Sequence, residues 1–322
     1  MQNSDGDCAE PPESGNGKQN IKRTIMKELY TRRNTSECLG AAWTLMSTNL
    51  THIAKSLWIP TLIFSLAYAL LAVVALSLAK GYILNQNILF NTFAAGILFI
   101  VAVATELAIL AKTYKLLNEQ TFKFCIKRSF KSFLIIVLLS IVALLVFTAI
   151  LAGMLIAINK GSLSPKIGTA LTLLVTLLFS VLIFVFFSPL SFVFTKYMVE
   201  PDTKLKHTWK NYRIGMRRLG FIIGCNLLCL LIVVTVFNIT ALPAYIATLA
   251  ATLSTNGIAN GDVAGLPDYF PVVYGVTMFI AGIVYTVLFV WYTLATYYQY
   301  ASIEARNGRT DLQTEETEHI NG

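Results

Sequence analysis

Six long stretches of the chain contain no Asp, Glu, Lys or Arg, and this pattern restricts the possible folds more than any other feature of the sequence. The stretches cover residues 56–79, 81–105, 132–159, 167–195, 219–261 and 269–303. The hydrocarbon core of a bilayer is about 30 Å thick, and roughly 20 apolar helical residues are enough to cross it. Their hydrophobicity is continuous and does not alternate, which favours transmembrane helices over the strands of a membrane barrel.

The sequence therefore predicts six membrane crossings. We place them at residues 57–79, 88–111, 132–158, 168–195, 219–242 and 272–298. The fifth stretch is too long for one crossing and contains Pro243, followed by Ser, Asn and Gly residues between positions 254 and 261. We expect a loop with irregular backbone there, outside the lipid, because lipid cannot satisfy the polar groups of such a backbone.

Composition agrees with a chain that lies mostly in lipid. Only 13% of its 322 residues are charged, whereas a soluble domain carries about 25%, so a water-soluble enzyme is excluded. Residues 1–34 and 304–322 are polar, and we expect disordered cytoplasmic ends on either side of a membrane domain at 35–303.

Basic residues are concentrated on one side of the predicted spans. Of the 25 Lys and Arg residues, all but Lys80, Lys160 and Lys166 fall before span one, between spans two and three, between spans four and five, or after span six. The positive-inside rule then predicts a multi-pass membrane protein with both termini in the cytoplasm. This distribution accounts for the net charge of +8 without nucleic acid as a partner. The expected partners are the bilayer with its anionic headgroups and, as an open alternative, another membrane protein.

The segment before each pair of spans has the spacing of an amphipathic helix. Apolar residues recur every three or four positions in 35–57, 118–133 and 202–219. Such helices lie in the headgroup plane, with their basic residues toward anionic lipid. We expect the anionic-lipid contacts to come from Lys127, Lys131, Lys206, Lys210, Arg213 and Arg217.

These segments also align with one another, which predicts an internal repeat. The hairpin ends match as well, at 111–114 (AKTY), 194–197 (FTKY) and 295–298 (ATYY). Each unit crosses the membrane twice, so the three units have the same orientation. The predicted fold is an all-α integral membrane protein of six transmembrane helices in three hairpins, each preceded by an amphipathic interfacial helix.

A few polar residues within the spans are candidates for a functional site. Glu106 is the one acidic residue within a predicted span, and an intramembrane carboxylate suggests a proton or cation site. The alternative is a carboxylate near the interface that pairs with a basic loop residue or is reached by water. Span four carries a stripe of hydroxyl residues, which predicts either a polar path or a seam where helices pack closely. The candidate polar pathway comprises Glu106, Thr172, Thr176, Ser180, Ser188 and Asn226.

Small residues on span six, Gly275, Gly282, Thr286 and Thr293, form a similar but weaker stripe. No motif supports catalysis or metal binding: His52, His207 and His319 do not have the spacing of metal ligands. We therefore expect no catalytic residues, no metal and no cofactor.

Three segments carry a resemblance to a known group of proteins. They are AAWTLMSTNLTHIAKSLWIPTLIF at 41–64, FKFCIKRSFKSFLIIVLL at 122–139 and HTWKNYRIGMRRLGFIIG at 207–224. The chain resembles uncharacterised bacterial six-span inner-membrane proteins, which are similar to the membrane domain fused to some glycerophosphodiester phosphodiesterases. The resemblance covers about residues 35–303 and implies the six-span fold and a location in the bacterial inner membrane. It implies no activity, because the chain has no phosphodiesterase domain.

Two functions of different classes follow from these patterns. The first is a membrane protein without catalytic activity of its own, which organises lipid or assists other membrane proteins. The alternative is a transporter or channel for a small polar or anionic solute that uses Glu106 and the hydroxyl residues of span four. An intramembrane enzyme is a third alternative, which the missing motifs disfavour.

Overall fold

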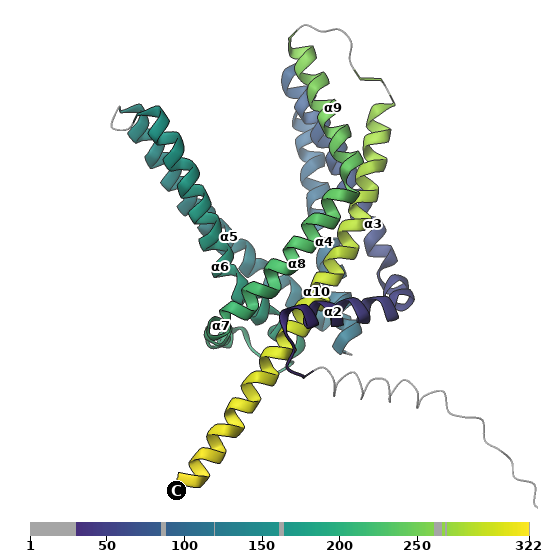
Figure 1. The fold of residues 1–322 in the computed structure, drawn as a ribbon. Helices are drawn as coiled ribbons and strands as arrows, with labels where there is room; N and C mark the ends of the chain where they lie inside the picture. Colours follow the sequence, from purple (N-terminus) through teal and green to yellow (C-terminus); the bar gives the residue numbers. More distant parts are fainter. Residues whose placement is uncertain are drawn as a thin grey trace, which may run out of the picture. The chain divides into compact units, whose positions relative to one another are not determined.

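The computed structural model describes residues 30–84, 88–118, 120–160, 164–260, 266–267 and 269–321. Throughout the described residues the secondary structure is helical (Figure 1), in agreement with the predicted fold class. Residues 1–29, most of the expected disordered N-terminus, lie outside the described residues. The helices are α2 (Thr35–Thr48), α3 (Leu50–Leu84), α4 (Ile88–Asn118), α5 (Phe122–Asn159), α6 (Pro165–Val199), η1 (Leu205–His207), α7 (Thr208–Arg217), α8 (Leu219–Thr240), α9 (Leu242–Ala259) and α10 (Phe270–Asn321).

Six of the described helices are long and apolar enough to cross a membrane: α3, α4, α5, α6, α8 and α10. Spans one to four and span six each lie wholly inside one of these helices. Span five ends two residues beyond α8, at 242 instead of Thr240. The prediction of six transmembrane helices is confirmed. It succeeded because hydropathy depends on the local sequence and needs no tertiary information.

The loop predicted after span five is wrong in its first part, where the chain forms α9. Pro243 does not end a helix here, because it is the second residue of α9 and the first helical turn needs no N–H donor there. Ala244, Ala247 and Ala251 form a buried face of this helix. The Thr248 hydroxyl donates to the Ala244 carbonyl at 2.7 Å and lies 3.3 Å from the Tyr274 hydroxyl of α10. Packing of these small residues against neighbouring helices, α3 among them, stabilises α9.

The three segments that precede the hairpins differ in continuity. The first is separated from its span at Asn49, between α2 and α3, and the third is separated at Arg218, between α7 and α8. The second differs from expectation, because residues 122–133 are the first turns of α5 and continue into the span without a break. The amphipathic character of these segments and the threefold repeat stay predictions.

Contacts divide the chain into two compact units, residues 35–300 and residues 1–34 with 301–322. In the smaller unit the Ser302 hydroxyl accepts from the Arg33 amide at 3.0 Å and donates to the Arg33 carbonyl at 3.1 Å. Arg306 also donates to that carbonyl, at 2.7 Å. α10 continues to Asn321, through the tail for which composition favours disorder; the boundary at 303 stays a prediction.

In the larger unit, the core between α3, α4 and α10 is packed closely. Leu57, Phe64, Ile109 and Val290 belong to one buried cluster. Gly282 of α10 lies so near α3 that a Cβ atom on it would be 2.9 Å from the Ser65 Cα. The predicted small-residue stripe on span six thus includes a position where two helix backbones approach closely.

Candidate functional site

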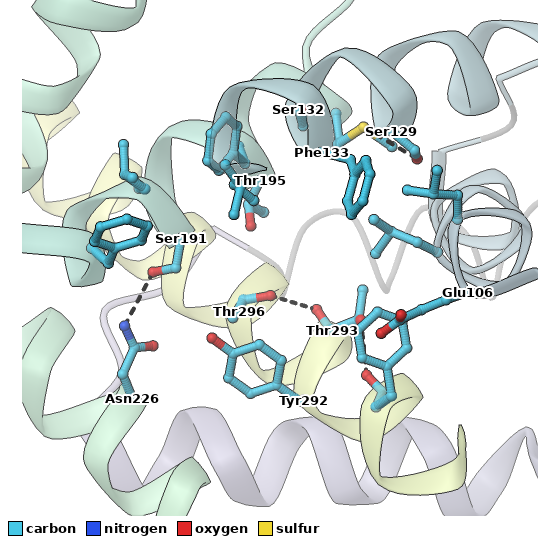
Figure 2. A pocket seen from close by; sticks show the side chains of 18 of the residues that line it. Glu106, Ser129, Ser132, Phe133, Ser191, Thr195, Asn226, Tyr292, Thr293 and Thr296 are labelled. Atoms are coloured by element: carbon cyan, nitrogen blue, oxygen red, sulfur yellow. Dashed lines mark hydrogen bonds between the residues drawn. The ribbon is translucent and has the colours of Figure 1, made fainter. Parts of the chain in front are cut away.

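A cavity of about 640 Å³ lies between α4, α5, α6, α8 and α10 (Figure 2). One end is lined by Tyr114, Ser129 and Thr195, which are next in sequence to Lys115, Arg128 and Lys196. Glu106, Val233 and Tyr285 line it further along the spans. The cavity is therefore built from the halves of these helices that lie nearer the basic segments.

Glu106 contributes the charge of this cavity. Its carboxylate accepts a hydrogen bond of 2.9 Å from the hydroxyl of Tyr285, so α4 is linked to α10 at this point. Glu106 lies six residues before Lys112, about 9 Å along the helix axis, and Lys112 donates to the carbonyl of Ser56 at 3.0 Å. The partner shown for Glu106 is thus a tyrosine hydroxyl and not the basic loop residue that the sequence offered as an alternative.

Hydroxyl groups from three helices converge on the other parts of the cavity (Figure 2). Tyr114 of α4 donates to the hydroxyl of Thr195 on α6 at 3.2 Å. Thr296 of α10 donates to the Thr293 carbonyl at 2.9 Å. The lining is therefore hydroxyl-rich where the last turns of α4 and α6 meet the middle of α10.

Two buried polar atoms in the lining have no hydrogen-bond partner. Asn226 of α8 is 7% exposed; its amide nitrogen donates to Ser191 at 3.3 Å and to the Ser188 carbonyl at 3.4 Å, which leaves the oxygen unpartnered. Ser132 of α5 is 5% exposed, and its hydroxyl also has no partner. Both residues line the cavity. An unpaired buried polar group costs about 1–3 kcal/mol, so these atoms favour a bound molecule that would pair with them.

Apolar and aromatic side chains make up most of the remaining wall. Five phenylalanines and three tyrosines line the cavity, together with leucine, isoleucine, valine and methionine. Among the residues that line it, none is Lys, Arg or His. A mostly apolar cavity of this size with a few convergent polar groups is typical of a small-molecule site.

The structure brings together three of the six predicted pathway residues. Glu106, Ser188 and Asn226 line this cavity. Thr176 and Ser180 instead line a second cavity, of about 560 Å³, between α5 and α6. Thr172 lines neither cavity, and its hydroxyl donates to the Gly168 carbonyl at 2.9 Å. These three hydroxyl residues lie in the first half of α6, whereas the second half lines the cavity. They therefore do not join Glu106.

The sequence analysis missed several residues of the site. Tyr285, Tyr292 and Ser132 carry no signal in the sequence, because an aromatic or a serine inside an apolar stretch is ordinary. Only the tertiary structure places Tyr285 opposite Glu106. Thr293 and the hydroxyls of Ser191 and Thr195 belonged to predicted stripes, but nothing local shows that the stripes of α6 and α10 face one cavity.

All six residues predicted to contact anionic lipid are exposed: Lys127, Lys131, Lys206, Lys210, Arg213 and Arg217. On α7 the buried residues are Asn211 and Gly215, and a Cβ atom on Gly215 would lie 3.2 Å from the side chain of Pro189 on α6. The Tyr212 hydroxyl donates to the Phe186 carbonyl at 3.1 Å, and burial raises the pKa of this phenol above its ordinary value. α7 is therefore attached to α6 by one face and presents its basic residues on another.

Arg128 differs from its basic neighbours because it is buried. Its guanidinium donates to the carbonyls of Tyr197, Glu200, Pro201 and Thr203. It also lies over the rings of Phe124 and Tyr197, at 4.2 and 4.5 Å from their centroids. The last carbonyls of a helix lack partners within the helix and form the negative end of its dipole. Arg128 thus binds the end of α6 to the start of α5.

Within the part of the chain that the structure describes, no three His, Cys, Asp or Glu side chains are grouped so that they could hold a metal ion. Cys38, Cys125, Cys225 and Cys229 are buried.

The six apolar helices define an α-helical, multi-pass membrane protein. Comparison with family models, with curated protein sequences and with solved structures finds no match to this chain. The resemblance to six-span inner-membrane proteins therefore stays a prediction.

Proposed function

We propose that this protein is a transporter or channel of the bacterial inner membrane, with both termini in the cytoplasm, that takes up a small solute in the cavity around Glu106. The observation that carries this proposal is the cavity of about 640 Å³, which joins a carboxylate to two buried polar atoms without partners. An ionisable residue inside a membrane is costly and marks solute or ion pathways by default.

The position of the cavity also supports this function. Five helices from all three predicted hairpins contribute to it, so a relative movement of the hairpins would change its access. Transporter sites are commonly formed where structural repeats meet. The cavity lies near the basic ends of the spans, which the positive-inside rule assigns to the cytoplasm, and we propose that solute enters or leaves there.

A lipid-organising role without transport is the second candidate, and the exposed faces of the segments before the hairpins favour it. Trp43, Trp58 and Trp209 are 60%, 58% and 66% exposed. On α7 the exposed Trp209 and Met216 lie beside basic residues, among them Arg213, whose guanidinium is 5.7 Å from the Trp209 ring. Tryptophan and basic residues together are typical of helices at the membrane interface.

Cysteine accessibility distinguishes these two functions. Thr293 lines the cavity and is 3% exposed, and Thr286 on the same helix is also 3% exposed but does not line it. We expect Thr293→Cys to react with a membrane-impermeant cationic methanethiosulfonate reagent in membrane vesicles, because a transport site is reached by water. Thr286→Cys, the matched control, is expected to stay unreactive.

The measurement is made in a Cys8→Ser background, on vesicles of both orientations, by counting modified thiols with mass spectrometry. The four buried native thiols give the baseline. If Thr293→Cys is as unreactive as Thr286→Cys from both sides, the cavity is closed to water and the transport proposal is wrong. The lipid-organising role would then be preferred.

A further inference from the structure

Several of the hydrogen-bonded side chains in the cavity lining have only acceptors left free, whereas the unpaired Ser132 hydroxyl can also donate. Ser188, Ser191 and Thr293 donate their hydroxyl protons to carbonyls of their own helices, at 2.7, 2.8 and 2.9 Å. Hydroxyls that are bonded in this way keep lone pairs but have no proton left to offer.

The two principal polar groups of the cavity show the same bias. Asn226 uses its amide nitrogen on Ser191 and the Ser188 carbonyl, and its oxygen is left without a partner. Tyr285 donates its hydroxyl proton to Glu106, so that group also offers no donor. A carboxylate has about four lone-pair positions, and one hydrogen bond from Tyr285 leaves the others open. A molecule in this cavity would therefore meet these free acceptors as well as the Ser132 hydroxyl.

The charge of the cavity lining also favours a ligand that is a cation. Glu106 is the one charged residue among those that line the cavity, and none of them is basic. Eight aromatic residues line the cavity. The face of an aromatic ring attracts a cation within about 6 Å. An anion would meet a carboxylate with no basic residue in the lining to balance it.

We infer that the cavity binds an amphipathic organic cation, such as an amine or a quaternary onium ion with apolar groups, and rejects anions. The inference rests on the proposed function, since it names the substrate class of the same site. It differs from the sequence analysis, which named a small polar or anionic solute, because it excludes anions. The cation would lie against Glu106, and its apolar groups would lie against the phenylalanines. Where the cation is a protonated amine, its N–H group would donate to the Asn226 oxygen or to Ser132.

Three probes with similar ring content and different charge test this inference. They are tetraphenylphosphonium, tetraphenylborate and uncharged triphenylmethanol. Their binding to the purified full chain in an uncharged detergent is measured by equilibrium dialysis, with empty micelles as the blank. We expect saturable binding of the phosphonium, at least about ten-fold tighter than that of the borate, which is the scale of one charge-assisted contact.

Substitutions of two glutamates show where the selectivity arises. Glu106→Gln keeps the shape of the side chain and removes its charge, and we expect it to weaken phosphonium binding about ten-fold or more. Glu37→Gln is the matched control, because Glu37 is exposed on α2 and does not line the cavity. Glu106→Asp retains the charge and should retain the preference for the cation. Gel filtration of each variant shows that it is folded.

The outcomes separate this inference from the proposed function. Equal binding of the borate or of triphenylmethanol would overturn the charge selectivity and leave solute binding in place, as would an unchanged preference in Glu106→Gln. Failure of all three probes to bind would count against the proposed function itself.

Discussion

Arg128 lies among basic neighbours in the sequence but has a different environment from them in the fold. Lys127 and Lys131 are exposed, whereas the Arg128 guanidinium is buried between two rings and bonded to carbonyls at the end of α6. A planar guanidinium suits this position because it offers several donors in fixed directions and stacks on aromatic faces. Arg128 therefore stabilises the larger unit, although the sequence counts it only as one more positive charge.

Arg128→Met should destabilise the protein strongly. The methionine would fill similar space but leave the carbonyls of Tyr197, Glu200 and Pro201 without their donor, and we expect a loss of about 3 kcal/mol. Thermal unfolding of the detergent-solubilised protein measures the effect. Lys127→Met is the matched control and should change stability by less than about 0.5 kcal/mol. Equal melting temperatures for the two variants would contradict this role of Arg128.

Close contact between helices depends on small residues at particular positions of each element. In α10, Gly282 lies against the backbone of Ser65 on α3, whereas Gly275 would bring a Cβ atom only to 3.4 Å from Val73. In α9, three buried alanines form the face that packs against neighbouring helices of the larger unit. Small residues therefore mark the buried faces of α3, α9 and α10, because they let a neighbouring helix come close. Hydrophobicity does not mark these faces, since lipid is as apolar as the protein interior.

Gly282→Ala should separate α3 and α10. Its Cβ atom would lie 2.9 Å from the Ser65 Cα, which cannot move without its helix, and overpacking of this kind costs about 1–3 kcal/mol. Gly96→Ala is the control, because no atom lies within 4 Å of the added carbon, and alanine favours a helix by up to about 1 kcal/mol over glycine. The melting temperature should fall for Gly282→Ala and stay level or rise for Gly96→Ala. The opposite order would show that the two helices are not in close contact.

Orientation is a property of the whole molecule, and it follows from the uneven distribution of basic residues. With six crossings, both ends of the chain are expected on one side, together with the basic segments. Moving a lysine or arginine through the bilayer centre is costly, so we expect the basic side to stay in the cytoplasm. The exposed residues Asn260 and Gly308 are then expected on opposite sides of the membrane.

Cysteines at these two positions report the orientation in intact cells. We expect Asn260→Cys to react with an impermeant maleimide added outside, and Gly308→Cys to react only after the membrane is permeabilised. A Cys8→Ser background removes a cysteine that precedes the described residues. External labelling of Gly308→Cys, or protection of Asn260→Cys, would show that the number of crossings or their direction is wrong.

Prediction from the sequence was most successful where local composition decides the outcome and least successful where contacts decide it. The six spans were found because apolar runs of sufficient length have few alternatives to a helix in lipid. Pro243 was misinterpreted as the end of a helix, because its position in the first turn of α9 depends on packing of Ala244 and Ala247. Of the candidate site, Glu106, Ser188 and Asn226 were found by their polarity, whereas Tyr285 and Ser132 were not.

The sequence by itself determined that the chain is helical and that six of its helices are fit to cross a membrane, because hydropathy and charge act residue by residue along the chain. Only the tertiary structure decided which polar residues share a cavity, which arginine is buried and where the helices touch. These features depend on residues that are far apart in the sequence, such as Glu106 and Tyr285 at 179 positions, and no local pattern shows that two such residues will meet.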